Sequence, residues 1–278
     1  MGKTVRNGAI ELLRFLFAIG VAIFHARGVF SLHLETGKWR FFGNGAVGVE
    51  FFLVLSGFFL AQNVYKKSQA GPSDDIGRET LSFFAKKYFS IFRYSSIFFI
   101  TALLIEIIHR HYSLKSSIML LIDGLPQLFM LDMTGIRFGF VNGYMWYLSA
   151  MLISMAVIYP LARKNTSLFI HIIAPLAAIL VYGVIIANYG TIATISTWTG
   201  IVYKGLLRAF AGVLLGCASF AVFEGLKEIS FTLFGKIILS IFEIFLYVVA
   251  FVYINLRLPD TYFFYFRKLQ VQVGHPHE

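Results

Sequence analysis

Seven stretches of the sequence are long and apolar enough to cross a lipid bilayer, and they restrict the possible folds more than any other feature. A transmembrane helix needs about 20 mostly apolar residues. Such stretches lie at 8–26, 45–65, 89–108, 143–162, 168–188, 199–223 and 236–256. Inside a bilayer every backbone polar group must be bonded within the protein, so these segments are predicted to be helices. The sequence therefore predicts an all-α fold, a polytopic transmembrane helical bundle of seven or eight spans.

An eighth apolar stretch, residues 114–134, contains polar and turn-forming residues. They are Asp123, Gly124, Pro126 and Asp132. We expect a surface or re-entrant segment here, because irregular backbone at membrane depth has to be surrounded by protein or water. The longest hydrophilic break is 66–88, and its Gly-Pro-Ser-Asp-Asp core predicts a turn or loop.

The composition indicates that lipid surrounds most of the chain. Of its 278 residues 58% are hydrophobic and 14% are charged, whereas soluble domains are roughly 45–50% apolar and about 25% charged. The net charge of +10 would suggest nucleic acid in a soluble protein. Here the basic residues cluster between apolar stretches, where topology and anionic lipid headgroups explain them. We therefore expect the lipid bilayer as a partner and no nucleic acid.

The distribution of Lys and Arg predicts the orientation. With the N-terminus in the cytoplasm, the inner segments hold eleven of these residues and the outer segments nine. This weak bias has the direction of the positive-inside rule. The first stretch carries ionisable residues and lacks a signal-peptide cleavage pattern, so it is expected to remain as a span. Residues 1–256 are then one transmembrane domain, and 257–278 are a polar C-terminal tail.

The first stretch, "ELLRFLFAIGVAIFHA" (11–26), contains three ionisable residues, which by default indicate function inside a membrane. Arg14 and His25 are eleven residues apart, which places them on one helix face, about 16 Å apart along the axis. Glu11 precedes Arg14 by one turn and can pair with it. A histidine suits base chemistry near neutral pH. These residues alone also allow a simple packing pair and an interfacial histidine.

The second stretch, "GAVGVEFFLVLSGFFLAQ" (45–62), combines glycines with an acid. Small residues let helices approach closely, so helix packing is the expected role of Gly45, Gly48 and Gly57. Glu50 needs a partner at its depth in the membrane. A contact with His25 near the outer surface would fix the tautomer of the imidazole and stabilise its cation.

Three motifs together identify a family. Arg14 and His25 match an arginine and a histidine in the family's first helix, separated by ten residues. The segment "GAVGVEFFLVLSGF" matches G-x-x-G-V-[DE]-x-F-F-x-x-S-G-F, with one residue fewer between the acid and the second Phe, and "GYMWYLSAMLI" (143–153) matches a W-Y-[LF]-S helix. With these motifs in the right order, the chain resembles the acyltransferase-3 family of multi-pass bacterial membrane acyltransferases.

The resemblance implies an enzyme of the bacterial inner membrane that moves acyl groups, commonly acetyl, to surface glycans. Cytoplasmic acyl-CoA would be the donor substrate, with no bound cofactor, and a glycan or lipid-linked sugar would be the acceptor. Acyl transfer to a hydroxyl needs a base and stabilisation of the developing oxyanion. The implied catalytic residues are His25, Arg14 and Glu50. His25 acts as general base or carries the acyl group, and Arg14 holds a phosphate or carbonyl oxygen of the donor.

The resemblance also implies a donor-binding element at the third helix, where the family has a basic R-x-x-R sequence that meets phosphates of the coenzyme. In "FFAKKYFSIFRYSS" (83–96), Lys87 takes the first position and Ser90 the second, while Arg93 follows one turn later. We expect Lys86, Lys87 and Arg93 to bind the donor. A positive-inside anchor is the alternative for the two lysines.

Trp146, Tyr147 and Arg208 are the residues expected to bind the acceptor. An aromatic belt at the membrane surface is an alternative for Trp146 and Tyr147. Lys204 and Arg208 share a helix face, and snorkelling to the outer interface is the alternative for both. His109 and His111 have no nearby acids, so we expect no metal site.

The resemblance covers roughly residues 1–225, and the family core has more helices than the seven found here. The chain is thus expected to be C-terminally truncated, and an inactive family member is one alternative to an active enzyme. A transporter or flippase-like protein is another. It predicts Gly- or Pro-broken helices in two related halves, and none is evident.

Overall fold

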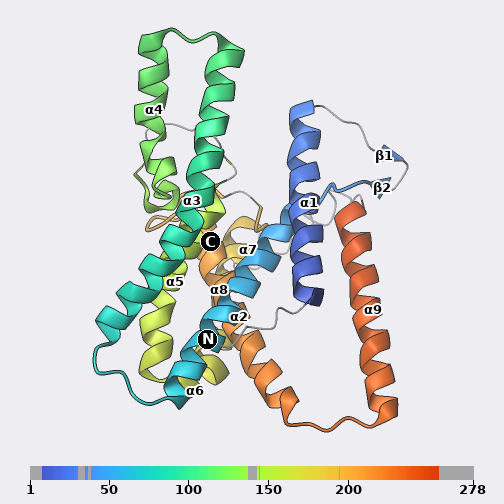
Figure 1. The fold of residues 1–278 in the computed structure, drawn as a ribbon. Helices are drawn as coiled ribbons and strands as arrows, with labels where there is room; N and C mark the ends of the chain where they lie inside the picture. The colour runs from blue at the N-terminus through green and yellow to red at the C-terminus, as the bar shows by residue number, and fades with distance from the viewer. Residues whose placement is uncertain are drawn as a thin grey trace, which may run out of the picture. The chain divides into compact units, whose positions relative to one another are not determined.

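The computed structural model describes residues 8–30, 35–36, 39–136, 143, 145–193 and 195–256. Almost all of this part of the chain is helical (Figure 1). Seven helical segments are long and apolar enough to cross a membrane: Gly8–Ala26, Gly45–Gln69, Ile76–Arg110, Trp146–Lys164, Thr166–Tyr189, Lys204–Lys227 and Leu233–Asn255. Each overlaps one predicted span, so the polytopic all-α fold is confirmed.

The chain forms two compact units, of which the first combines Met1–Phe52 with Val222–Glu278. Its described elements are α1 (Gly8–Phe30), a two-stranded hairpin of β1 (Glu35–Thr36) and β2 (Trp39–Arg40), a short 3-10 turn η1 (Gly45–Val47), the first residues of α2 (Gly48–Gln69), the last turns of α8 (Lys204–Lys227) and α9 (Leu233–Asn255). The turn after the hairpin is bonded to the end of α9. Phe42 donates its backbone N–H to Oδ1 of the buried Asn255 over 2.9 Å, and Asn44 Nδ2 donates to the carbonyl of Tyr253 over 2.8 Å.

Glycines hold the start of α2 against α1 in this unit. A Cβ on Gly45 would lie 2.5 Å from the carbonyl oxygen of Gly20, and a Cβ on Gly48 would lie 2.7 Å from Cγ2 of Val21. The rings of Phe17 and Phe51 stack beside them, with centroids 4.3 Å apart. The packing role predicted for Gly45 and Gly48 is confirmed.

The second unit, Leu53–Ala221, contains the rest of α2 and most of the remaining helices. They are α3 (Ile76–Arg110), α4 (Leu114–Leu128), the 3-10 turn η2 (Asp132–Thr134), α5 (Trp146–Lys164), α6 (Thr166–Leu168), a π-helical turn η3 (Phe169–Ile173), α7 (Ala174–Tyr189) and the greater part of α8. Figure 1 shows α4 folded back beside the end of α3. At about 1.5 Å per residue α4 is about 22 Å long, shorter than the hydrocarbon core of about 30 Å. This agrees with the surface or re-entrant segment expected there.

The hydrophilic break at 66–88 is much shorter than expected. Helix α2 continues to Gln69, and α3 begins at Ile76, so only residues 70–75 connect them. Asp75 caps α3 by accepting a 2.9 Å hydrogen bond from the backbone N–H of Arg78. The turn or loop predicted at the Gly-Pro-Ser-Asp-Asp core (71–75) is confirmed. The extent of the break was wrong because hydropathy detects only the part of a helix that lies in lipid, and α3 has 35 residues, more than the bilayer requires.

Helices α2 and α8 cross through a pair of glycines. A Cβ on Gly57 would overlap the backbone carbonyl of Val213, and a Cβ on Gly216 would overlap the carbonyl of Val54. Between helices in lipid, close backbone approach at small residues supplies packing that apolar burial does not. The packing role of Gly57 is confirmed, and Cys217, beside the crossing, is buried.

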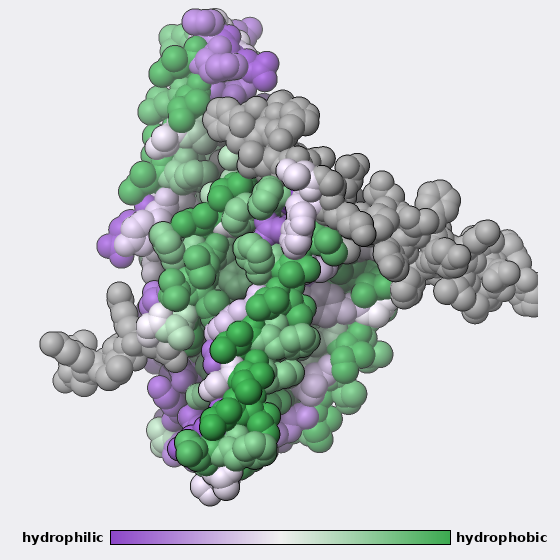
Figure 2. Space-filling model, turned by 90° about the vertical axis from the view of Figure 1, so that its right-hand side faces the viewer, coloured by the Kyte–Doolittle hydropathy of each residue, from purple (hydrophilic) through white to green (hydrophobic). Residues whose placement is uncertain are grey.

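Apolar side chains cover most of the surface seen in Figure 2. On α9 the exposed large apolar residues include Phe234, Ile241, Phe245 and Phe251. Hydrophilic residues gather at the turn that joins α3 to α4 (Figure 2). This distribution is typical of helices whose sides face lipid and whose ends face water.

Candidate functional site

Arg14 and His25 lie on one uninterrupted helix, α1, as their spacing requires. Arg14 Nη1 donates to Glu11 Oε1 over 2.8 Å, so the predicted pairing is confirmed, and the two side chains remain 39% and 46% exposed. His25 lies in the last third of α1 with a partly exposed ring, packed edge-on against Phe24 at 5.0 Å between centroids. The helix therefore places an ion pair and an imidazole three turns apart.

Glu50 lies in the first turn of α2 and is partly buried. Its neighbours Gly48 and Phe51 pack on α1 at Phe17. The beginning of the acidic motif is thus held against the helix that carries Arg14 and His25. The contact between Glu50 and His25 stays a prediction.

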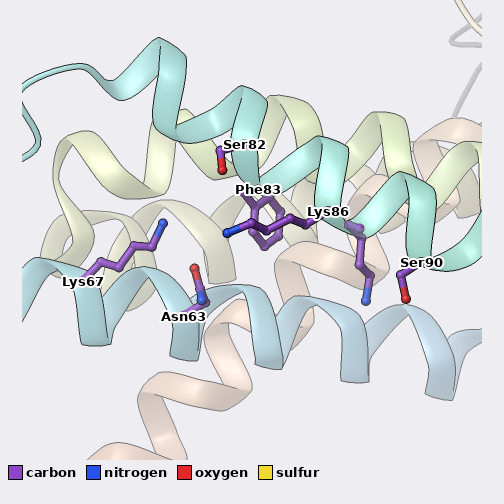
Figure 3. Close-up of a pocket in the computed structure, with 7 residues that line it drawn as sticks. Asn63, Lys67, Ser82, Phe83, Lys86 and Ser90 are labelled. Carbon is purple, nitrogen blue, oxygen red and sulfur yellow. The ribbon is translucent and has the colours of Figure 1, made fainter. Parts of the chain in front are cut away.

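A pocket of about 330 Å³ opens between α2 and α3 in the second unit. Its lining is Asn63, Lys67, Ser82, Phe83, Lys86, Lys87 and Ser90. Figure 3 shows the amines of Lys67 and Lys86 extending into the space between the two helices, with Asn63 between them. Three cations, two hydroxyls and an amide converge here beside one aromatic ring, which is a suitable arrangement for a phosphorylated ligand with an apolar part.

Two of the three predicted donor-binding residues lie in this pocket. Lys86 and Lys87 line it, and so does Ser90, the residue at the second position of the basic element. Arg93 is not in the lining. It is exposed, and its guanidinium lies 5.5 Å from the ring centroid of Tyr94. Arg93 follows Ser90 by three positions, about 60° round the helix, and its side chain lies against Tyr94 rather than in the pocket.

Beside the pocket, four side chains form a hydrogen-bonded ion network. Glu79 Oε1 accepts from the hydroxyl of Tyr159 at 2.6 Å, from Lys67 at 3.1 Å and from Nε of Arg163 at 3.1 Å. Lys67 also donates to the Tyr159 hydroxyl over 2.8 Å, and Arg163 Nη2 donates to the carbonyl of Gly71 over 3.0 Å. The network ties α2, α3, α5 and the 70–75 connection together.

Lys204 and Arg208 are buried at the start of α8, with 0% and 5% of their surface exposed. Lys204 Nζ donates to the carbonyl of Thr191 over 3.0 Å, and Arg208 Nη1 donates to that of Ile192 over 3.3 Å. These side chains point into the protein, so the snorkelling interpretation is wrong. Sequence spacing cannot distinguish a cation at an interface from one that is held by backbone carbonyls.

The guanidinium of Arg208 lies 5.4 Å from the ring centroid of Trp146. Trp146 is 8% exposed, so it faces the interior of the second unit and is not a lipid-facing belt residue. Tyr147 is partly buried, with its ring 6.5 Å from that of Trp146. The structure therefore brings together all three residues expected to bind the acceptor.

A comparison with known protein families gives one decisive match. The model of the acyltransferase-3 family, described as an acyltransferase domain, matches residues 7–270. The chain belongs to this family. No curated protein and no solved structure matches.

As an acyltransferase-3 protein, the chain is a membrane acyltransferase, and the residues that the structure describes contain seven candidate spans. The match extends beyond residue 225, so the family likeness covers more of the chain than its motifs indicated. It also enters 257–278, the expected polar tail, which lies outside the described residues.

Other residues of the acyltransferase-3 motifs hold the helices together. Ser56 donates to the sulfur of Met151 over 3.0 Å, which joins α2 to α5. Ser149, the serine of the W-Y-L-S run, is fully buried and accepts the backbone N–H of Met133 over 3.2 Å. These residues shape the interior of the second unit.

The Glu79 network, with Lys67 as a member, was not predicted from the sequence. Glu79 was assigned to a loop, and Lys67 and Arg163 were counted only among the charges that predict the orientation. One sequence signal does indicate a helix that contains Glu79. Asp75 is a good helix N-cap residue, and the apolar positions that follow Glu79 continue a helix.

Proposed function

We propose that the protein is a membrane O-acyltransferase that moves an acyl group, expected to be acetyl, from cytoplasmic acyl-CoA to a hydroxyl of a surface polysaccharide or another glycan. The lysine-lined pocket between α2 and α3 carries this proposal. Acyl-CoA has several phosphates on a nucleotide and an apolar arm. Lysine binds phosphate as a point charge, and Phe83 supplies an apolar wall. This pocket also contains the residues that fall on the family's phosphate-binding element.

In the proposed reaction, His25 acts on the acceptor hydroxyl. The imidazole removes the hydroxyl proton as the oxygen attacks the thioester carbonyl, and a tetrahedral oxyanion forms. A positive charge or hydrogen-bond donor at the carbonyl would stabilise that oxyanion. Arg14 lies about 16 Å from His25 along α1, so the role that we assign to it is to hold a phosphate of the donor. The carbon–sulfur bond then breaks, the ester remains on the sugar, and the imidazolium returns its proton to the leaving thiolate. Glu50 would orient the imidazole and stabilise its cation.

The same residue types also permit a covalent route. His25 would attack the thioester first and carry the acyl group before the sugar hydroxyl takes it. The two routes differ in whether the protein itself carries label, and the experiment on His25 below separates them.

The acceptor is proposed to bind at Trp146, Tyr147 and Arg208. An aromatic face can stack against the apolar face of a sugar ring, and a guanidinium can donate to several hydroxyls. Arg208 already lies against Trp146, so its position does not depend on the ligand. Lys204, held one turn away, adds a second positive charge.

The proposed orientation predicts a pattern of surface labelling. With the N-terminus in the cytoplasm, Asp74 in the 70–75 connection lies inside and Lys115 on α4 lies outside. Both side chains are exposed, and Cys217 is buried, so single cysteines can be introduced. A membrane-impermeant maleimide should label Lys115→Cys in spheroplasts and Asp74→Cys only after the membrane is opened. The opposite pattern would show that the orientation is inverted.

The function itself is tested by transfer of label. Membranes that contain the protein are incubated with acetyl-CoA radiolabelled in the acetyl group and with cells or lipid-linked sugars that carry candidate glycans. We expect alkali-labile label in the glycan that membranes without the protein do not produce. Absence of label across a broad panel of acceptors, with a properly folded protein, would favour the inactive family member.

A further inference from the structure

The amine of Lys67 faces the pocket from α2, opposite the lysines of α3. We infer that Lys67 is a third phosphate-binding cation of the donor pocket, and that Glu79 and Tyr159 are positioning residues that hold its amine there. The inference rests on the proposed function, because it takes the phosphorylated donor as the ligand of this pocket.

The hydrogen bonds of Lys67 leave its amine able to bind a ligand. An ammonium group has three N–H donors. Among the described residues, one goes to Glu79 Oε1 at 3.1 Å and one to the Tyr159 hydroxyl at 2.8 Å. The third is available to the pocket that Lys67 lines, and its side chain is 40% exposed.

The charges of the network favour an anion in the pocket. Glu79 carries one negative charge between two cations, Lys67 and Arg163. Together these three groups have a net charge of +1. Lys86 and Lys87 add two positive charges on the facing helix. A donor with several phosphates would balance this excess, and an apolar ligand would not.

The network also fixes the position of Lys67. A free lysine loses rotamer freedom when it binds a phosphate, and prior ordering lowers that cost. Tyr159 is itself held, because its ring stacks on Phe83 with centroids 4.2 Å apart. Arg163, whose side chain is 7% exposed, anchors Glu79 and the carbonyl of Gly71. Phe83 is part of the lining, so the network shapes two sides of the pocket.

The experiment measures the binding of coenzyme A by calorimetry to the purified full chain in nanodiscs of zwitterionic lipid. Lys67→Gln removes the charge and leaves a polar side chain that is one atom shorter. A hydrogen bond to a charged group is worth about 1.5–3 kcal/mol, so we expect the dissociation constant to rise about tenfold or more. Lys66→Gln is the matched control, because Lys66 is the preceding residue on α2, is exposed and lies outside the lining. Its affinity should equal that of the wild type.

Double substitution tests the positioning role of Glu79. When Glu79 acts through Lys67, the effects of Glu79→Gln and Lys67→Gln on affinity are not additive, and the double variant binds like Lys67→Gln alone. Lys67→Arg keeps the charge and should restore part of the affinity. Tyr159→Phe keeps the stacking on Phe83 and should weaken binding by less than Lys67→Gln. Additive effects of the two single substitutions would overturn the positioning role.

The outcomes separate this inference from the proposed function. Wild-type affinity in Lys67→Gln, together with loss of binding in Lys86→Gln and Lys87→Gln, would overturn the inference and leave the donor pocket in place. No binding of coenzyme A by the wild type would overturn both. The last measurement repeats the titration in nanodiscs with anionic lipid. If the affinity for coenzyme A falls by the same factor in the wild type and in Lys67→Gln, the lipid competes at a site that does not include Lys67, and the inference stands. If the protein binds anionic lipid through Lys67 and binds no coenzyme A, the ligand is a lipid headgroup and the inference is overturned.

Discussion

Replacing His25 by alanine should abolish acyl transfer while the protein still folds and binds coenzyme A. General acid–base catalysis contributes about 10²–10⁴-fold to a rate, and alanine removes the only group at this position that can accept the proton. The ring is partly exposed, so its loss creates little buried cavity. The measurement is the initial rate of transfer from labelled acetyl-CoA to the glycan, at equal amounts of protein.

His109→Ala is the control for this substitution, since His109 lies in the last turn of α3 and is exposed. It should retain wild-type activity. Equal rates in the wild type and in His25→Ala would refute a catalytic role for His25. Quenching the reaction without acceptor distinguishes the two routes: label on the wild-type chain that is absent from His25→Ala identifies an acyl carrier, and label on neither identifies a base.

Adding one methyl group at Gly57 or at Gly216 should destabilise the protein strongly. In each case the new Cβ would overlap a backbone carbonyl, which cannot move aside as a flexible side chain can. Overpacking costs about 1–3 kcal/mol and sometimes more, and here the helices themselves must separate. Gly57→Ala and Gly216→Ala should each unfold at a lower temperature in detergent and yield less monodisperse protein.

Gly183→Ala is the matched control, because Gly183 lies inside α7 and no described atom outside its own stretch of helix lies within 4 Å of the position that a Cβ would take. Alanine also has the higher helix propensity, so this variant should be as stable as the wild type or slightly more stable. Wild-type stability of Gly57→Ala would contradict the close crossing of α2 and α8.

Hydropathy was sufficient to locate the spans, because a bilayer demands long apolar helices wherever the chain crosses it. It failed for the first turns of α3, which continue outside the lipid as a polar helix, and so Glu79 was assigned to a loop. The motifs indicate Arg14, His25 and Glu50 by residue type and spacing, and their catalytic role stays a prediction. The carbonyls that hold Lys204 and Arg208 come from residues 191 and 192, and the partner of Phe42 is Asn255. Such pairings depend on tertiary contacts that no local pattern records.

Helix α2 sets the length of a ligand that can lie along it within the second unit. Ser56 precedes Lys67 by eleven residues, a separation of about 16 Å along the axis. A donor whose phosphates are held near Lys67 can reach the level of Ser56 only through a long, thin and flexible arm. Small acyl phosphates carry the anionic group but lack that reach. Under the proposed function, the length of this helix would select the donor by its span as well as by its charge.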